Sequence, residues 1–336
     1  MTKYITPLTV AFALSFTACG GGGGSGDAVV RVCAANTIIS TYNTTGIAQD
    51  VSVDGDLAVV AQGNDGVAVF DVTNRNAPIL LAEVNAIGDV LSARIHNNHI
   101  YAYVLNSLKI IDISDVSNLT VSASIPLSIQ AEGANTIKTQ WIEFDNNYIH
   151  VLANTDEYNI YDITDTSNPV ATGSLTVDSS CGGGDGLYSV RVKNDIAYIG
   201  SYKGLRMVDI SDRSNPIQIS EVLSGCNENT IDISGDILYM AGGDYIKSYN
   251  IADPNNVYSL DYLSELNKFR VVSEIKGTAY GLGDGGEISI IDVSNPSAIV
   301  DTNNNLFVSV SKMITDDETY LYIADSDGLK IMDSCK

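Results

Sequence analysis

The sequence predicts an all-β protein, a seven-bladed β-propeller whose last blade is closed by an N-terminal strand. One short pattern recurs seven times: two to four apolar residues, then Asp or Asn, and in most copies Ile or Val followed by Ser or Thr. The copies lie 41, 50, 47, 41, 42 and 41 residues apart. A period in the forties built from short strands is typical of four-stranded propeller blades, and no helical periodicity competes with it. The polar residues of the pattern are Asp71, Asp112, Asp162, Asp209, Asn250, Asp292 and Asp333.

The first element along the chain, residues 1–18, is predicted to be a lipoprotein signal peptide. Lys3 precedes a mostly apolar stretch, Tyr4–Phe16, which is too short to span a bilayer comfortably. Phe16-Thr17-Ala18-Cys19 resembles the bacterial lipobox, although Phe stands where Leu is commoner. The resemblance implies cleavage before Cys19 and lipidation of that residue. The alternative is an ordinary secretory signal that is cleaved elsewhere.

Residues 19–32 are predicted to form a flexible tether, because Gly20–Gly24 is a run of five glycines. The propeller then occupies residues 33–336. The residue after Cys19 is Gly20 rather than Asp, and by resemblance to the sorting rule of Gram-negative bacteria this implies the outer membrane. We therefore expect an exported chain, lipid-anchored to the cell envelope at the outer membrane or the cell surface.

Each propeller unit divides into the same four strands, which the fourth unit shows most clearly. Asn194-Asp195 makes a tight turn between the first two strands, and Asn, Asp and Gly tolerate the positive φ that such hairpins need. Pro216 opens the fourth strand, which must then be an edge strand. We expect the same role for Pro78, Pro169, Pro254 and Pro296. The predicted strands of this unit are 188–193, 196–201, 204–210 and 217–222.

The repeat resembles the LVIVD family of bacterial and archaeal surface proteins. Leu205-Arg206-Met207-Val208-Asp209 and Leu329-Lys330-Ile331-Met332-Asp333 match the motif best. The resemblance implies a surface-exposed propeller and does not imply an enzymatic activity.

The seventh unit ends after its third strand, so the apolar segment 37–42 is predicted to supply the missing outer strand. Apart from Cys19 the chain has four cysteines, which allow three pairings. Closure of the ring would bring Cys33 next to Cys335. Cys181 and Cys226 lie in neighbouring blade connectors on one face. We therefore predict the disulfides Cys33–Cys335 and Cys181–Cys226, which fit an oxidising compartment. A metal site is the competing interpretation, but the chain has no Cys-x-x-Cys and no nearby His.

The formal net charge of −23 argues against nucleic acid as a partner. The expected partner is a protein or an envelope polymer that is neutral, cationic or bridged by a metal ion. The protein should meet the membrane only through its lipid anchor, and we expect a monomer.

Candidate binding residues come from the strands expected to surround the central tunnel. Alignment of the first strands places Ser52, Arg94, Glu143, Arg191 and Asp232 at equivalent positions, with Lys312 close to the same level. Such a ring would bind a small zwitterion or polarise a substrate. The alternative is a set of salt bridges that only solvates the tunnel. Further candidates are Tyr188 in the fourth unit and the single Trp141, a recognition residue or one that packs between blades; the three histidines, His96, His99 and His150, do not converge.

Three functions remain open from the sequence. The first is a non-catalytic binding scaffold of the envelope that presents one propeller face to its partner. The second is a hydrolase or lyase with a tunnel site, using Glu143 with Arg94 or Arg191. The third is an adhesion module stabilised by Ca²⁺, with Asp325 and Asp327 as weak candidate ligands, although Asp-Gly is also common hairpin chemistry. No other cofactor is expected, and binding is preferred to catalysis.

Overall fold

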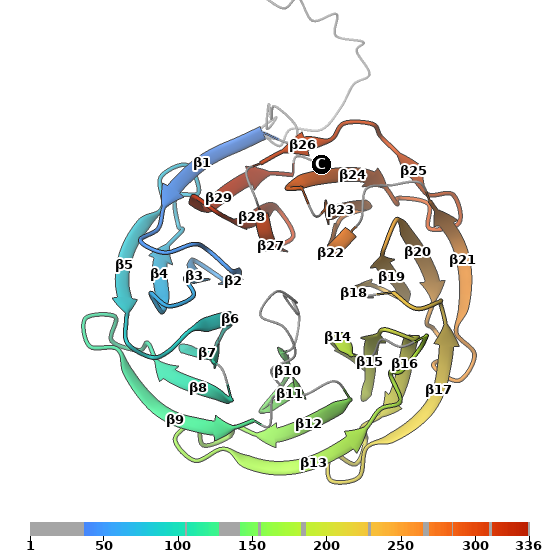
Figure 1. The fold of residues 1–336 in the computed structure, drawn as a ribbon, viewed down its shortest axis with the longest axis horizontal. Helices are drawn as coiled ribbons and strands as arrows, with labels where there is room; N and C mark the ends of the chain where they lie inside the picture. The colour runs from blue at the N-terminus through green and yellow to red at the C-terminus, as the bar shows by residue number, and fades with distance from the viewer. Residues whose placement is uncertain are drawn as a thin grey trace, which may run out of the picture. The chain divides into compact units, whose positions relative to one another are not determined.

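The computed structural model describes residues 37–104, 106–127, 142–153, 156–182, 186–227, 230–264, 269–283, 285–308 and 311–334, the side chains of residues 270, 311 and 312 excepted. These residues form seven antiparallel sheets arranged as blades around a central axis (Figure 1). The predicted all-β, seven-bladed propeller is confirmed. In the described part of the chain, none of the helices is long and apolar enough to cross a membrane.

The strands of each blade follow one another from the axis to the rim, and we refer to them as the first to the fourth strand. Blade 1 contains β2 (Asp50–Asp54), β3 (Leu57–Ala61), β4 (Val67–Asp71) and β5 (Ile79–Val84); blade 2 contains β6 (Val90–His96), β7 (His99–Val104), β8 (Ser107–Asp112) and β9 (Thr120–Pro126); blade 3 contains β10 (Ile142–Asp145), β11 (Tyr148–Ala153), β12 (Glu157–Asp162) and β13 (Val170–Thr176); blade 4 contains β14 (Leu187–Lys193), β15 (Ile196–Ser201), β16 (Gly204–Asp209) and β17 (Ile217–Leu223). Blade 5 contains β18 (Thr230–Ser234), β19 (Ile237–Gly242), β20 (Tyr245–Asn250) and β21 (Tyr258–Leu263); blade 6 contains β22 (Phe269–Ile275), β23 (Thr278–Gly283), β24 (Glu287–Asp292) and the short outer strands β25 (Val300–Asp301) and β26 (Leu306–Phe307); blade 7 contains β27 (Ser311–Asp316), β28 (Tyr320–Asp325), β29 (Gly328–Asp333) and β1 (Thr37–Asn43).

Blade 7 combines both ends of the described chain, as the sequence predicts. The N-terminal strand β1 pairs antiparallel with β29, from Thr37 opposite Asp333 to Asn43 opposite Gly328. The ring is thus closed by main-chain hydrogen bonds between residues almost 300 positions apart. Cys33 and Cys335 lie outside the described residues, so their predicted disulfide stays a prediction.

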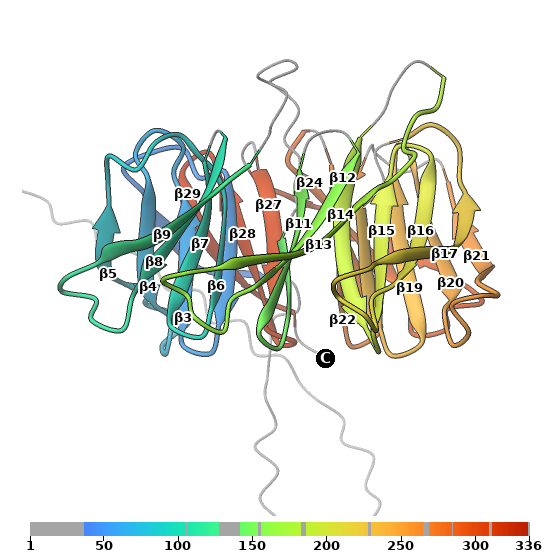
Figure 2. The same ribbon diagram turned by 90° about the horizontal axis from the view of Figure 1, so that it is seen from below.

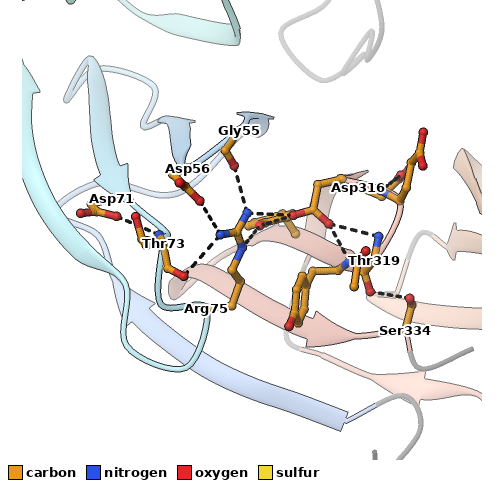
Figure 3. A network of polar contacts seen from close by, with 12 residues as sticks. Gly55, Asp56, Asp71, Thr73, Arg75, Asp316, Thr319 and Ser334 are labelled. Atoms are coloured by element: carbon orange, nitrogen blue, oxygen red, sulfur yellow. Dashed lines mark hydrogen bonds and ion pairs between the residues drawn. The ribbon is translucent and has the colours of Figure 1, made fainter. Parts of the chain in front are cut away.

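Arg75, in the turn after β4 of blade 1, adds side-chain contacts with blade 7 to the same closure (Figure 3). Its guanidinium donates to the Asp56 carboxylate at 2.7 Å within blade 1 and reaches Asp317 of blade 7 at 3.2 Å. Its Nε donates to the Tyr322 hydroxyl at 3.1 Å. Burial would lower the pKa of Arg75, but the hydrogen bonds to Asp56 and Tyr322 outweigh burial and raise it. The side chain therefore stays charged and links the last blade to the first.

The Asp or Asn of the repeat closes the turn after the third strand in blades 1 to 6. Asp71 Oδ1 accepts the Thr73 N–H at 2.8 Å, and the pKa of Asp71 is lowered by hydrogen bonds from Thr73. In blade 5 the Asn250 amide oxygen accepts the Ala252 N–H at 3.0 Å and replaces the carboxylate. The repeat thus keeps an oxygen acceptor here because the turn leaves an N–H without a main-chain partner.

The prolines after the third strand have two roles, and the sequence interpretation recognised only one. Pro216 immediately precedes the edge strand β17, as expected, and so do Pro78 and Pro169. Pro254 and Pro296 instead lie four residues before their outer strands, at the second position of a turn. That turn is closed by Asn256 N to Asp253 O in blade 5 and by its equivalent in blade 6. The expectation was wrong for these two, because proline also suits this turn position, where its fixed φ is favourable and no N–H is needed.

The blades pack face to face through fully buried apolar side chains. Val60 and Phe70 of blade 1 belong to one cluster with Leu321 of blade 7 and Ile288 of blade 6. Several inner tyrosines also donate to the next blade, as Tyr239 does to the Val293 carbonyl at 3.2 Å. Packing and these hydrogen bonds keep the first strands at fixed positions around the axis.

The two faces of the ring differ in the connections that they carry (Figure 2). The hairpins between the first and second strands share one face with the turns between the third and fourth strands; we call it the turn face. The connectors that lead from one blade to the next lie on the opposite face, together with the hairpins between the second and third strands; we call it the connector face. Thr37, the start of β1, pairs with the end of β29 and therefore lies at the turn face.

Candidate functional site

The central tunnel is the candidate site, and one residue from each first strand occupies the same register position around it. Each of these residues pairs with the third residue of the second strand in its own blade, as Glu143 pairs with His150. The five residues aligned from the sequence occupy this ring. The ring consists of Ser52, Arg94, Glu143, Arg191, Asp232, Ser273 and Thr315.

Two of the ring positions were missed by the sequence alignment. In blade 7 the position belongs to Thr315, because Thr315 pairs with Tyr322 and a longer turn follows β27. Lys312 lies three residues earlier on the same strand, outside this register position, and its side chain is not among those described. Counting back from the Lys276-Gly277 turn, whose residues both have positive φ, would have located Ser273. Trp141 lies outside the described residues.

The ring residues line a cavity of about 300 Å³. Charged and hydroxyl groups share its wall with apolar side chains from four blades. The described lining contains neither Cys, His, Lys nor Tyr. It consists of Ser52, Val53, Arg94, Ile95, Ile142, Glu143, Phe144, Arg191, Asp232, Ser273, Met313, Ile314, Thr315 and Asp316.

Arg94 is neutralised from behind the cavity wall. One terminal nitrogen, Nη1, lies 2.9 Å from both carboxylate oxygens of Asp50 and also donates to the Val51 carbonyl at 3.1 Å. Asp50 is 2% exposed and accepts the Ser92 hydroxyl at 2.5 Å as well. A buried carboxylate with these donors fixes the arginine, so Arg94 adds little net charge to the cavity.

Arg191 lies between two carboxylates of the neighbouring blades. Its Nε donates to Asp232 Oδ1 at 3.3 Å, and its Nη1 is 3.7 Å from Glu143 Oε2. Burial raises the pKa of Glu143 despite the opposing charge of Arg191. A quarter of the Glu143 side chain, 26%, remains exposed in the tunnel. The structure thus brings Glu143 and Arg191 together, as a tunnel enzyme would need, but the arginine is shared with Asp232.

The ring also satisfies the open inner edges of the first strands. The Ile95 N–H donates to Ser52 Oγ at 3.2 Å, and the Glu274 N–H donates to Asp232 Oδ2 at 2.8 Å. In each case an inner N–H of one blade finds a side-chain acceptor on the preceding blade. Part of the ring is therefore structural, and a serine performs this role as well as an aspartate.

Asp316 lies one position beyond the ring and faces the cavity. Its carboxylate accepts the Ser273 hydroxyl and, at 2.9 Å, the Glu318 N–H. Burial and then the nearby charge of Asp232 raise the pKa of Asp316 to about 6. Among the described residues, no ion pair to Asp316 forms within 4.0 Å, in contrast to Asp232 and Asp50.

The histidines do not form a catalytic group in the structure. His150 is fully buried in β11, and its Nδ1 lies 2.6 Å from the Tyr158 hydroxyl. Burial lowers the pKa of His150 to about 4. His96 stacks on Phe144 at 4.3 Å, and His99 contacts Thr166 of the next blade at 2.9 Å.

On the connector face, the predicted Cys181–Cys226 disulfide is confirmed, with 5.4 Å between the Cα atoms. It joins the connector that enters blade 4 to the connector that leaves it. Lys203 and Asp178 form an ion pair at 2.5 Å beside it. Tyr188 is only 6% exposed, so its ring lies within this packed region rather than on the open surface.

The weak calcium candidates lie in the hairpin between β28 and β29. Asp325 is fully buried and forms an ion pair with Lys330, whose ammonium is also 3.7 Å from Asp327. The lysine therefore neutralises the buried Asp325 without a metal ion. In the described part of the chain, no group of three or more His, Cys, Asp or Glu residues could hold a metal ion.

Comparison with known proteins agrees with this architecture. The LVIVD repeat model matches residues 45–86, 88–125, 187–224, 281–306 and 314–334. The units around Asp162 and Asn250 fall outside these matches, yet both fold as blades. The chain is thus a β-propeller in which five segments match the LVIVD repeat. No curated protein matches it.

Two solved structures have the same fold. The crystal structure of BamB from Moraxella catarrhalis superposes with a TM-score of 0.62 at 14% identity, over 87% of each chain. The computationally designed Ika8 protein gives a TM-score of 0.60 at 12% identity, over 89% of this chain and 99% of Ika8. At these identities the similarity establishes the fold alone.

Proposed function

We propose that this β-propeller of LVIVD repeats is an exported, lipid-anchored scaffold of the cell envelope that binds its partner with the connector face. The ring is the rigid part of such a scaffold. Cys19 is the proposed lipidated residue, and the glycine-rich segment after it is the proposed tether. The anchored leaflet would be that of the outer membrane, where Gly20 favours sorting.

The position of Thr37 is the observation that carries this proposal. The first described strand starts at the turn face, so a tether that precedes it would join the propeller on that side. The connector face lies on the opposite side of the propeller and would then be directed away from the point where the tether joins it. A partner could approach that face without competing with the anchor.

The connector face is also the side on which the loops differ most between blades. The Cys181–Cys226 disulfide links the connectors on both sides of blade 4, and the Lys203–Asp178 ion pair joins the first of them to the hairpin between β15 and β16. Restrained loops lose less conformational entropy on binding, which favours their use in recognition. A disulfide also fits an oxidising compartment outside the cytoplasm.

The composition supports a partner with a neutral or basic surface. The chain carries 41 acidic and 18 basic residues, and this negative field would repel nucleic acid and anionic lipid. The lining of the tunnel adds a reason to prefer binding to catalysis. Glu143 and Arg191 meet there, but the arginine charge is divided between two carboxylates.

Site-specific photo-crosslinking in cells that produce the full-length chain tests the choice of face. A benzophenone amino acid would replace Ser180 on the connector face or Ser297 on the turn face. Both serines are exposed, and both donate their N–H to the side chain two residues earlier, at 3.3 and 3.1 Å. We expect a discrete adduct from position 180 and none from position 297. Equal adducts from the two positions, or adducts from position 297 alone, would refute the choice.

A further inference from the structure

We propose that the central tunnel binds a small aliphatic amine, whose positive charge is balanced by the carboxylates of Asp316, Asp232 and Glu143 in the tunnel wall. This inference goes beyond the proposed scaffold, because it concerns the axis of the ring rather than the connector face. It rests on three features of the described lining: its charge balance, its hydrogen bonds and the mixture of polar and apolar groups.

The side chains described around the cavity carry a net negative charge. Arg94 is matched by Asp50, which approaches it at 2.9 Å from behind the wall. Arg191 is then the remaining cation of the described lining and faces Glu143, Asp232 and Asp316. One cation cannot neutralise three carboxylates, and unneutralised carboxylates in a partly desolvated site favour a cationic ligand.

The hydrogen bonds show that this charge exceeds what the fold needs. Ser52 accepts the inner N–H of the next blade as Asp232 does, so a neutral oxygen suffices for that role. Among the described residues, the donors to Asp316 are both neutral, the Ser273 hydroxyl and the Glu318 N–H. Neither contact requires an ionised acceptor, so the negative charge of Asp316 is not explained by the structure around it.

The size and lining of the cavity indicate an organic cation rather than a bare ion. A volume of about 300 Å³ accommodates a small molecule, and it lies at the lower end of the range of ligand pockets. The three carboxylates come from blades 3, 5 and 7 and are not gathered as metal ligands. Ile142, Phe144 and Met313 line the same space and offer contacts for methylene groups.

Calorimetric titration of the full-length protein with 1,4-diaminobutane tests the inference. The neutral isostere 1,4-butanediol and CaCl₂ are titrated in parallel. We expect one saturable site for the diamine at pH 7.5 and an affinity at least about tenfold weaker in D316N, since a charged hydrogen-bonded contact is lost. D327N removes an equal charge from an exposed hairpin and should bind as the unaltered protein does.

Thermal unfolding of D316N separates a ligand site from a structural role. Asp232 and Arg191 face Asp316, with Glu143 further round the wall. The pKa of Asp316 is raised to about 6 in the folded state, so its ionisation destabilises the fold as pH rises from about 4 to 6. D316N should therefore raise Tm at pH 7.5 while it weakens diamine binding. A structural aspartate would give a lower Tm instead.

Several results would overturn the inference. They are the absence of diamine binding, equal binding of the diol, unchanged binding in D316N, or a lower Tm in that variant at pH 7.5. Binding of Ca²⁺ with the same dependence on Asp316, at an affinity equal to or above that of the diamine, would assign the site to an inorganic cation and reject the amine.

Discussion

Arg75 offers the sharpest test of how the ring is closed. Replacement of Arg75 by Ala removes its contacts with Asp317 at 3.2 Å and with the Tyr322 hydroxyl at 3.1 Å, both on blade 7. It also removes the contact with Asp56 at 2.7 Å, but Asp56 is 63% exposed, so solvent screens that pair and it contributes little. The side chains of Arg75 and Asp317 are each 17% exposed, so their pairing should account for most of the effect.

The magnitude follows from these contacts. A hydrogen bond that involves a charged group contributes about 1.5–3 kcal/mol, so the loss of two such contacts should lower the free energy of unfolding by about 2–4 kcal/mol after partial solvation of Asp317. An unfolding entropy of about 2.1 cal/mol/K per residue over roughly 300 residues gives about 0.6 kcal/mol/K, so we expect Tm to fall by roughly 3–7 °C.

Calorimetry combined with hydrogen exchange measures both the size and the place of the change. In R75A, faster exchange should be confined to blades 7 and 1. R213A is the matched control, because Arg213 makes the same kind of contacts, with Asp145 of blade 3 and with Asp195 at 2.6 Å. It should loosen blades 3 and 4 instead. If R75A left Tm unchanged, or loosened all blades equally, the assigned role of Arg75 would be wrong.

Three further predictions follow from the described contacts, and one follows from the sequence around Cys19. Because Cys181–Cys226 closes a separation of 45 residues, its replacement by two alanines should lower the free energy of unfolding by up to about 4 kcal/mol; a urea midpoint that does not change would contradict this. Cys19→Ala should abolish fatty-acid labelling and move the protein from the detergent to the aqueous phase in Triton X-114; retained labelling would exclude Cys19 as the lipidated residue. Hydrogen bonds from Ser211 hold the pKa of Asp209 below its usual 3.8, so the contribution of this carboxylate to the free energy of unfolding is lost as pH falls toward 3. Between pH 5 and 3, D209N should therefore lose less stability than the unaltered protein. Equal losses would refute the role of the charge. EDTA should leave Tm unchanged because Lys330 already neutralises Asp325; a fall in Tm that Ca²⁺ reverses would show a metal site instead.

The fold could be predicted from the sequence because its signals are local and are repeated. In blades 1 to 6 the Asp or Asn of the repeat closes a turn within two residues. The hairpin after the first strand fixes the register, as Asn194 and Asp195 do with positive φ. Seven copies of such signals define seven blades, and the one incomplete unit then requires β1. The prolines of blades 5 and 6 were misplaced because proline suits two positions of the same connection that lie three residues apart.

The candidate site was only partly predictable, because its chemistry depends on pairs formed between blades. The register placed Arg94 and Arg191 correctly, yet nothing in the sequence shows which carboxylate neutralises each arginine. Asp50 neutralises the first from 44 residues away, and Asp232 binds the second from 41 residues away. Asp316 was missed because it lies one position beyond the aligned ring, where several other blades have apolar residues such as Val53 and Phe144.

The charged residues at the turn face and those at the axis of the propeller therefore affect stability in opposite directions. At the turn face, Arg75 and Arg213 each join acidic partners of two adjacent blades, and their removal should cost stability. At the axis, Asp316 lowers stability at neutral pH because its pKa is raised in the folded state. A group that stabilises the fold is explained by the fold, whereas a group that destabilises it needs another explanation. By this criterion the arginines belong to the architecture, and the Tm of D316N at pH 7.5 tests whether the carboxylate in the tunnel does not.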